Sequence, residues 1–106
     1  MANWTDVVAA EYMPEGGRRL MRREGRSIAL FHVKGAHYAI DDSCPHAGGS
    51  LVLGRLDGAT VSCPAHGLRF DLATGCQSGV AGLRTQAFPV WLNAGRVEID
   101  LAPAAH

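Results

Sequence analysis

Cys44-Pro45-His46 and Cys63-Pro64-Ala65-His66 are the two short motifs on which the interpretation of this chain depends, and residues 47–62 separate them. Each motif contributes one thiol and one imidazole. A proline follows each cysteine directly, and glycines follow both histidines. A metal site needs soft or borderline donors held in place by rigid turns. The stretch 44–66 therefore predicts a metal site built from these four donors.

Two kinds of metal centre can use this donor set. A structural zinc site usually carries both cysteines in one turn and both histidines in the other. Here each turn carries one of each. The mixed arrangement suits a two-iron cluster in which one iron takes two thiolates and the other takes two imidazoles. The pattern favours the iron cluster. The alternative, a zinc-stabilised interaction module, predicts a colourless protein.

The two motifs resemble the Rieske family, whose pattern is Cys-X-His, a spacer of this length, and Cys-X-X-His. The resemblance begins at Asp41-Asp42-Ser43 and continues through residues 66–71 and Thr74-Gly75, which are similar to the stretch after the second histidine of Rieske ferredoxins. It implies a [2Fe–2S] cluster whose outer iron receives the electron. The implied ligands are Cys44 and Cys63 on the inner iron, and His46 and His66 on the outer iron.

Size and composition limit the other possibilities. The chain has 106 residues, enough for a single domain spanning residues 1–106, with 47% hydrophobic and 19% charged residues. Ten basic and ten acidic residues give a formal net charge of zero, which argues against nucleic acid or a membrane surface as a partner. No apolar run is long enough for a membrane anchor, and no signal pattern opens the chain. The third cysteine, Cys76, is expected to be a small buried side chain, and reduced thiols fit the cytoplasm.

The hydrophobic pattern predicts short strands and frequent turns, with no helical periodicity over twelve or more residues. We expect an all-β chain. The resemblance adds the Rieske fold: an antiparallel β-sandwich base with a small cluster-binding subdomain at about residues 43–85. The expected strands are residues 1–10, 18–23, 27–33 and 37–40, two brief strands within 54–62, then 88–92 and 96–101.

The resemblance also implies a low reduction potential within the Rieske range of roughly −150 to +300 mV. High-potential relatives carry an extra cysteine in each motif, and these positions correspond to Gly49 and Ala65 here. Such relatives also aim hydroxyl groups at cluster or ligand sulfurs, whereas the matching residues here are Leu68 and Phe70. Fewer hydroxyl donors stabilise the more negative, reduced state less.

The function implied by the resemblance is that of a soluble, monomeric electron carrier with no catalytic residue of its own. Its expected partners are a flavin-dependent NAD(P)H–ferredoxin reductase and a terminal oxygenase, most simply a ring-hydroxylating dioxygenase. The alternative is the small Rieske subunit of an assimilatory nitrite reductase. Many such subunits lack the ligands, so retention of all four favours the carrier.

The remaining conspicuous residues have simpler explanations. His32 and His37 are expected to be strand residues rather than ligands, and Trp4 and Trp91 to be packing residues. One departure from the family is that residues 79–82 lack the proline expected in a loop covering the cluster. An arginine run is expected to form a solvated strand face, with a docking patch for an acidic partner as the alternative. The run consists of Arg18, Arg19, Arg22, Arg23 and Arg26.

Overall fold

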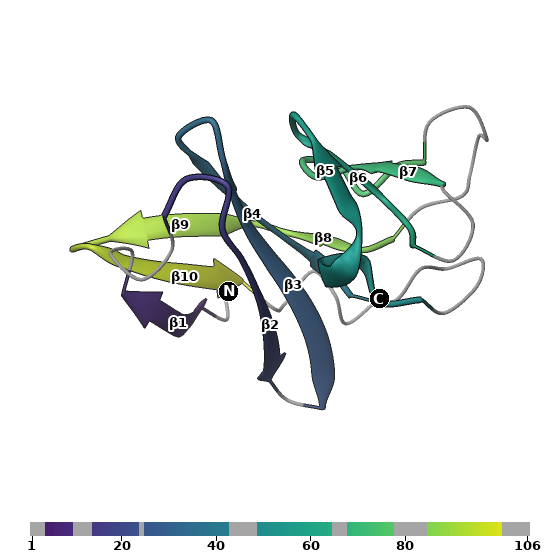
Figure 1. Cartoon of the computed structure of the whole chain (residues 1–106). Coiled ribbons are helices and arrows are strands. Elements are labelled where there is room, and N and C mark those ends of the chain that lie inside the picture. Colours follow the sequence, from purple (N-terminus) through teal and green to yellow (C-terminus); the bar gives the residue numbers. More distant parts are fainter. Residues whose placement is uncertain are drawn as a thin grey trace.

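The regular structure consists of strands and one short 3₁₀ helix in the part of the chain that the computed structural model describes, residues 4–9, 14–23, 25–42, 49–64, 68–77 and 85–100 (Figure 1). For residues 4–9 and 23 the backbone alone is described. The elements are β1 (Trp4–Ala9), β2 (Arg18–Arg23), β3 (Arg26–Val33), β4 (Ala36–Asp41), η2 (Leu51–Leu53), β5 (Arg55–Asp57), β6 (Thr60–Ser62), β7 (Arg69–Asp71), β8 (Ala87–Phe88), β9 (Val90–Asn93) and β10 (Arg96–Asp100).

The strands form three antiparallel sheets, with the strand orders β1-β10-β9, β2-β3-β4-β8 and β5-β6-β7. Short turns join β2 to β3, β3 to β4, β5 to β6 and β9 to β10, as the glycine-rich turn signals predict. The first sheet lies to the left of the central sheet in Figure 1 and the third lies to its upper right. The all-β, antiparallel prediction is confirmed.

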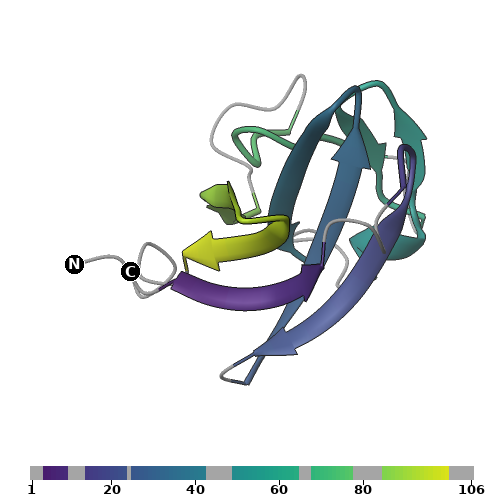
Figure 2. The ribbon, with the colours of Figure 1, turned by 90° about the vertical axis from the view of Figure 1, so that its left-hand side faces the viewer.

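The central strand β3 belongs to both hydrophobic cores because its side chains are buried on both faces. Ile28 and Leu30 pack with Val97 and Ile99 of β10, on the side where Figure 2 shows the β1-β10-β9 sheet. Ala29, Phe31 and Val33 point to the opposite face and pack in a second core. The apolar run in residues 28–31 matches this environment, since a strand covered on both faces needs apolar residues at successive positions. The second core also contains Leu51, Val52, Val61, Cys63, Phe70 and Leu72.

Pro89 divides a segment that the sequence predicts as one strand. Residues 88–92 were expected to be continuous, but β8 pairs with β4 of the central sheet whereas β9 pairs with β10. Proline has no N–H to donate to a ladder, so a strand commonly ends or changes partners there. The carbonyl of Pro89 accepts a hydrogen bond from the N–H of Asp100 at 3.0 Å, which joins the segment to β10.

The short strand β7 was not predicted. It contains a single apolar residue, Phe70, between Arg69 and Asp71, so its alternation is too brief to recognise. Phe70 is fully buried in the second core, and the two charged neighbours are exposed. None of the helical structure in the described residues could span a bilayer.

Candidate metal centre

Cys63 is the one predicted ligand within the described residues; Cys44, His46 and His66 lie outside them. It directly follows β6 and is 1% exposed. Its backbone N–H donates a hydrogen bond to the carbonyl of Leu68 at 2.6 Å, so the chain returns to the same place five residues later. This contact holds together the two ends of the second motif, and the buried thiol of Cys63 lies at that point.

Asp42 joins the residues before the first motif to the residues after it. It is 6% exposed, and its two carboxylate oxygens accept hydrogen bonds from the N–H of Val52 at 2.7 Å and the hydroxyl of Ser50 at 2.6 Å. Its backbone carbonyl also accepts from the N–H of Leu51 at 2.6 Å, and its own N–H donates to Ser27 of β3 at 3.0 Å. The described residues on the two sides of the first motif are therefore held together at one buried carboxylate.

The segment after the first motif lies against the strand before the second motif at Gly54. A Cβ at this position would collide with the backbone carbonyl of Ser62 and press on Val61, so only glycine allows so close an approach. The guanidinium of Arg18 donates to the carbonyl of Val52 at 3.0 Å and to that of Gly54. Arg18 thus joins β2 to the segment that follows the first motif. The close approach at Gly54 places the segments that flank the two motifs side by side.

The segment that begins at Thr85 is held beside the first motif through the turn at Thr74-Gly75. Gly75 has a φ of 79° and its carbonyl accepts from the N–H of Thr85 at 2.8 Å; a Cβ there would strike the carbonyl of Thr85. The hydroxyl of Thr85 in turn donates to the carbonyl of Asp41 at 3.1 Å. Asp71 accepts from the N–H groups of Ala73 and Thr74 and shapes the turn that leads to the glycine.

Two expectations about individual side chains are wrong. Cys76 is exposed rather than buried, because the turn at residues 72–75 holds it at the surface with its N–H on the hydroxyl of Thr74. Trp91 is 57% exposed, because it lies on β9 at the edge of its sheet rather than in a core. The side chain of Trp4 and residues 79–82 lie outside what the structure describes.

The arginine run forms a largely solvated face, as expected: Arg18, Arg19 and Arg22 are exposed, and Arg26 is half-buried. Arg22 donates to the hydroxyl of Ser27 at 2.9 Å. Arg18 also bonds the carbonyls near Gly54 and lies 5.9 Å from the centre of the Phe31 ring. This positioning role of Arg18 was not recognised in the sequence, where it is one member of a charged run.

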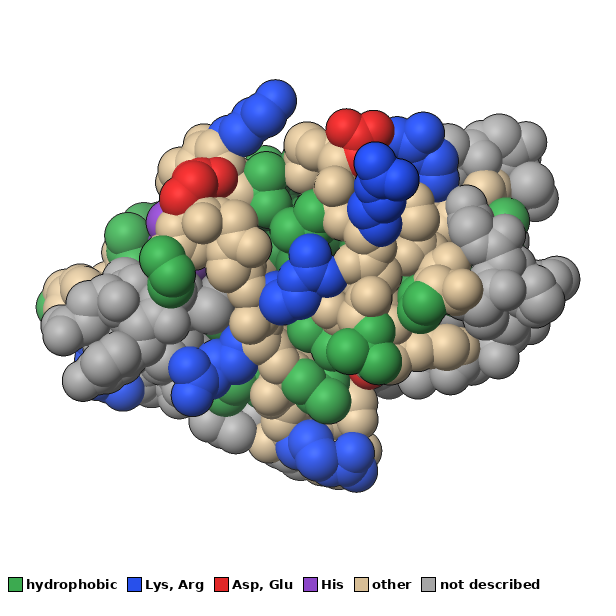
Figure 3. Space-filling view, viewed as in Figure 1, with side chains coloured by type: hydrophobic (Ala, Val, Ile, Leu, Met, Phe, Trp, Pro, Cys, Tyr) green, Lys and Arg blue, Asp and Glu red, His purple; other side chains and the backbone are tan. Residues whose placement is uncertain are grey.

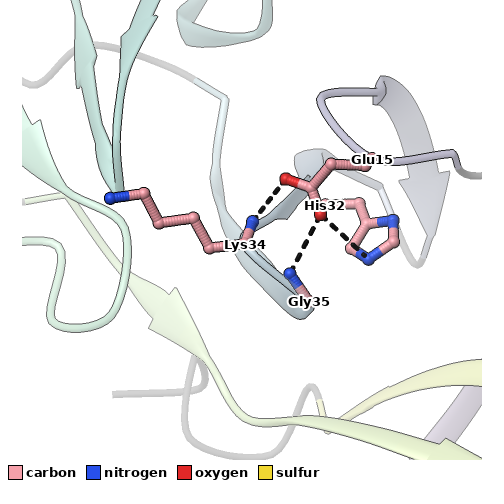
Figure 4. Close-up of polar contacts among 4 residues, drawn as sticks. All are labelled: Glu15, His32, Lys34 and Gly35. Atoms are coloured by element: carbon pink, nitrogen blue, oxygen red, sulfur yellow. Dashed lines mark hydrogen bonds and ion pairs between the residues drawn. The ribbon is translucent and has the colours of Figure 1, made fainter.

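His32 and His37 form a stacked pair across β3 and β4, with ring centroids 4.2 Å apart and an 8° angle between the rings. Glu15 faces the pair: its carboxylate accepts from the N–H groups of Lys34 and Gly35 and lies 3.7 Å from Nε2 of His32 (Figure 4). Nε2 of His37 is buried without a hydrogen-bond partner among the described residues. Within those residues no group of three or more potential ligands is arranged to hold a metal ion.

This cluster makes stability depend on pH in two separate windows. Burial lowers the pKa of His37 below 6.5, and the neighbouring His32 lowers it further. The backbone N–H groups of Gly35 and Lys34 lower the pKa of Glu15 below 4.5. In each case the unfolded chain binds more protons than the folded chain, so the stability present above the unfolded pKa is lost as the pH falls through the folded pKa.

We expect His37→Gln to reduce the loss of thermal stability between pH 7 and pH 5, because the substitution removes a group that prefers to protonate in the unfolded chain. Glu15→Gln should remove the loss below about pH 4.5, and it should steepen the loss between pH 7 and pH 5 because the Glu15 carboxylate raises the pKa of His37. Unfolding midpoints followed by circular dichroism across this pH range give both profiles. Parallel profiles for wild type and His37→Gln would contradict the assignment.

Comparison with known proteins identifies the family of this chain. A family model of the Rieske [2Fe–2S] domain matches residues 3–89. The chain belongs to the Rieske family. This Rieske protein is 37% identical over 102 residues to the ferredoxin component of a naphthalene 1,2-dioxygenase system from Pseudomonas aeruginosa, a match that covers 93% of this chain and 96% of the relative.

Solved structures agree with that placement. The complex of reduced oxygenase and oxidized ferredoxin in carbazole 1,9a-dioxygenase contains a chain that matches with a TM-score of 0.83 and 33% identity, covering 92% of each chain. A nitrite reductase small subunit from Mycobacterium tuberculosis matches with a TM-score of 0.87 at 19% identity, covering 94% of this chain and 96% of the other. At that identity the second match shows the shared fold.

The cofactor of this Rieske protein is a Rieske-type [2Fe–2S] cluster, and its role is that of an electron carrier rather than of a catalytic subunit. The described part of the site fits such a group. Cys63 supplies a buried thiol outside any disulfide, in an apolar surrounding that includes Val61 and Phe70. Thiolate is the cysteine form that ligates iron in these clusters.

Proposed function

We propose that this Rieske protein carries single electrons from a flavin-dependent NAD(P)H–ferredoxin reductase to a terminal oxygenase of the ring-hydroxylating type. The observation that carries the proposal is the 33% identity, over 92% of both chains, to a ferredoxin structure solved with its oxygenase. The naphthalene 1,2-dioxygenase ferredoxin component, at 37% identity, supports the same assignment. We place the carrier in the cytoplasm as a monomer.

The proposed ligands are Cys44 and Cys63 on one iron, and His46 and His66 on the other, within a cluster-binding subdomain at about residues 43–85. Support comes from the residues around the motifs. Asp42 holds together the chain on the two sides of the first motif, and the Cys63–Leu68 hydrogen bond does the same for the second. Gly54 lies against Ser62 between the two motifs. When bound, the cluster supplies storage for one electron. The protein supplies rigid attachment of the donors, and rigid ligands reduce the rearrangement that accompanies a change of charge.

The direct experiment is reconstitution with defined partners. The anaerobically purified chain should contain iron and acid-labile sulfide and show the visible and EPR spectra of a Rieske centre. A ferredoxin reductase with NADH or NADPH should reduce it, and the reduced form should support turnover by a ring-hydroxylating oxygenase. A colourless chain that binds zinc would overturn the cluster assignment. A coloured chain that instead co-purifies stably with a large haem-containing subunit would overturn the oxygenase assignment in favour of nitrite reductase, whose small subunit shares the fold.

Leu68 offers a test of the proposed low potential. It is half-buried and its carbonyl holds the N–H of Cys63, so a hydroxyl at this position lies near the ligand loop. Leu68→Ser should raise the midpoint potential, because a hydroxyl donor stabilises the more negative reduced state. A hydrogen bond that is about 1 kcal/mol stronger in the reduced state corresponds to roughly 40 mV for one electron.

Redox titration followed by circular dichroism measures this shift. Leu92→Ser is the matched control, since Leu92 is 54% exposed on β9 in a different sheet. An unchanged potential in Leu68→Ser would show that no hydroxyl at position 68 reaches the sulfurs. A wild-type midpoint well above zero at neutral pH would contradict the low-potential proposal itself.

A further inference from the structure

The outer face of the β5-β6-β7 sheet carries charge in two rows. The strand register places Arg55 beside Ser62 and Ser62 beside Arg69, which gives a row with two guanidinium groups. The next row on the same face contains Asp57, Thr60 and Asp71. The intervening residues Leu56, Val61 and Phe70 point inward to the core. The side chains of these two rows are therefore all polar, and the positive and negative charges are separated along the strands.

The positive row lies at the end of the sheet that leads into the second motif. Ser62 directly precedes the ligand Cys63, and Arg69 directly follows Leu68, whose carbonyl closes that motif. The negative row lies at the opposite end, where the turn at Gly58 joins β5 to β6. Basic and acidic side chains are visible together over this sheet in Figure 3, at the upper right.

An open groove of about 330 Å³ lies on this face and is lined by Arg55, Leu56, Asp57, Ser62 and Arg69. Arg69 pairs with Asp57 across the groove at 2.8 Å. No carboxylate among the described residues forms an ion pair with Arg55, which is exposed. Within the described part of the chain, the charge of Arg55 therefore has no ion-pair partner, and Arg55 lies beside Ser62 in the strand register.

We propose that this groove binds a carboxylate on the docking surface of a protein electron-transfer partner. The proposal rests on the function proposed above, because an electron carrier must meet its partner near the cluster. Arg55 presents a planar fork of donors that matches a carboxylate, and Ser62 adds a hydroxyl. The groove is open and adjoins the second ligand motif, so an acidic side chain seated there would bring the partner's surface against that motif. Complementary charge of this kind mainly raises the rate of association.

The test compares electron transfer with two haem proteins of opposite surface charge, acidic cytochrome b5 and basic cytochrome c. In each reaction one electron passes between the [2Fe–2S] centre and the haem iron, so one centre is oxidised as the other is reduced. Stopped-flow absorbance gives the second-order rate constant in whichever direction is downhill. At low ionic strength, Arg55→Glu should slow the reaction with cytochrome b5 about tenfold and accelerate that with cytochrome c.

Further variants separate the groove from general charge effects. Arg55→Gln should show a smaller change of the same sign, and Asp57→Asn should have the opposite effect because it frees Arg69 from its ion pair. Arg19→Glu makes the same change of charge on exposed β2, outside the groove, and should leave both rates near wild type. All differences should shrink as salt is added.

Two results would overturn the proposal. An equal effect of Arg55→Glu on both reactions, or the same effect from Arg19→Glu, would show that the groove does not select acidic surfaces. Every variant is first checked for the visible spectrum of the wild type. Absence of a Rieske spectrum from the wild-type chain would instead contradict the proposed function, so the two failures are distinguishable.

Discussion

Replacing His46 by alanine is expected to abolish the Rieske spectrum. The proposed outer iron has two imidazole ligands, and the substitution removes one of its four donors. An alanine methyl group cannot ligate iron, and a cluster with one histidine left no longer has the two-imidazole ligation of one iron that gives Rieske centres their potential and spectra. The variant should contain little iron and acid-labile sulfide after anaerobic purification. EPR of the dithionite-reduced protein, together with iron and sulfide analysis, measures this outcome.

The matched control is His37→Ala, another loss of an imidazole from the same domain. His37 stacks on His32 in the central sheet and belongs to no described group of potential metal ligands. This variant should keep a full Rieske spectrum even though it loses the stacking contact. An intact spectrum in His46→Ala, or an equal loss in both variants, would show that the ligand assignment is wrong.

Asp42→Ala should produce the second large effect. The substitution leaves the N–H of Val52 and the hydroxyl of Ser50 without their acceptor at a buried position. Each donor left without an acceptor costs about 1–3 kcal/mol, so we expect the free energy of unfolding to fall by about 2–6 kcal/mol. The first motif is also released at its base, which should make the cluster easier to remove.

Two measurements check this expectation: the thermal unfolding midpoint, and the rate at which a chelator bleaches the visible spectrum. Asp42→Asn is the control, since the side-chain amide retains an oxygen that accepts from Val52 and an NH₂ group that can donate to Ser50. It should therefore lie much nearer wild type than Asp42→Ala in both measurements. Equal bleaching rates for wild type and Asp42→Ala would contradict a role for this carboxylate in holding the first motif.

Much of the fold could be predicted because its signals are local. The apolar run at residues 28–31 indicated β3, and the turn at Lys34-Gly35 indicated its hairpin with β4. The two Cys–His motifs predicted the chemistry of the site independently of the fold, because ligand type and spacing follow from the cluster. The division of the closing segment at Pro89 also has a local cause, since proline has no N–H to donate to a continuous strand ladder.

The contacts that close the site could not be predicted, because they join residues distant in sequence. In the sequence, Asp42 is one of two acidic residues that precede the first motif. Its hydrogen bonds from Val52 and Ser50 depend on where the chain lies after that motif. The contact between Gly54 and Ser62 likewise needs the packed structure. The exposure of Cys76 was missed because cysteine is usually buried, and its turn overrides that tendency.

The position of β3 between the two cores has a consequence for how the molecule denatures. Its alternating side chains belong to opposite cores, with Leu30 in one and Phe31 in the other. Unfolding of either core would expose one face of β3 to water. It would also weaken the β3 hydrogen bonds on which the packing of the other core depends. We therefore expect the two cores to unfold together, in one cooperative transition.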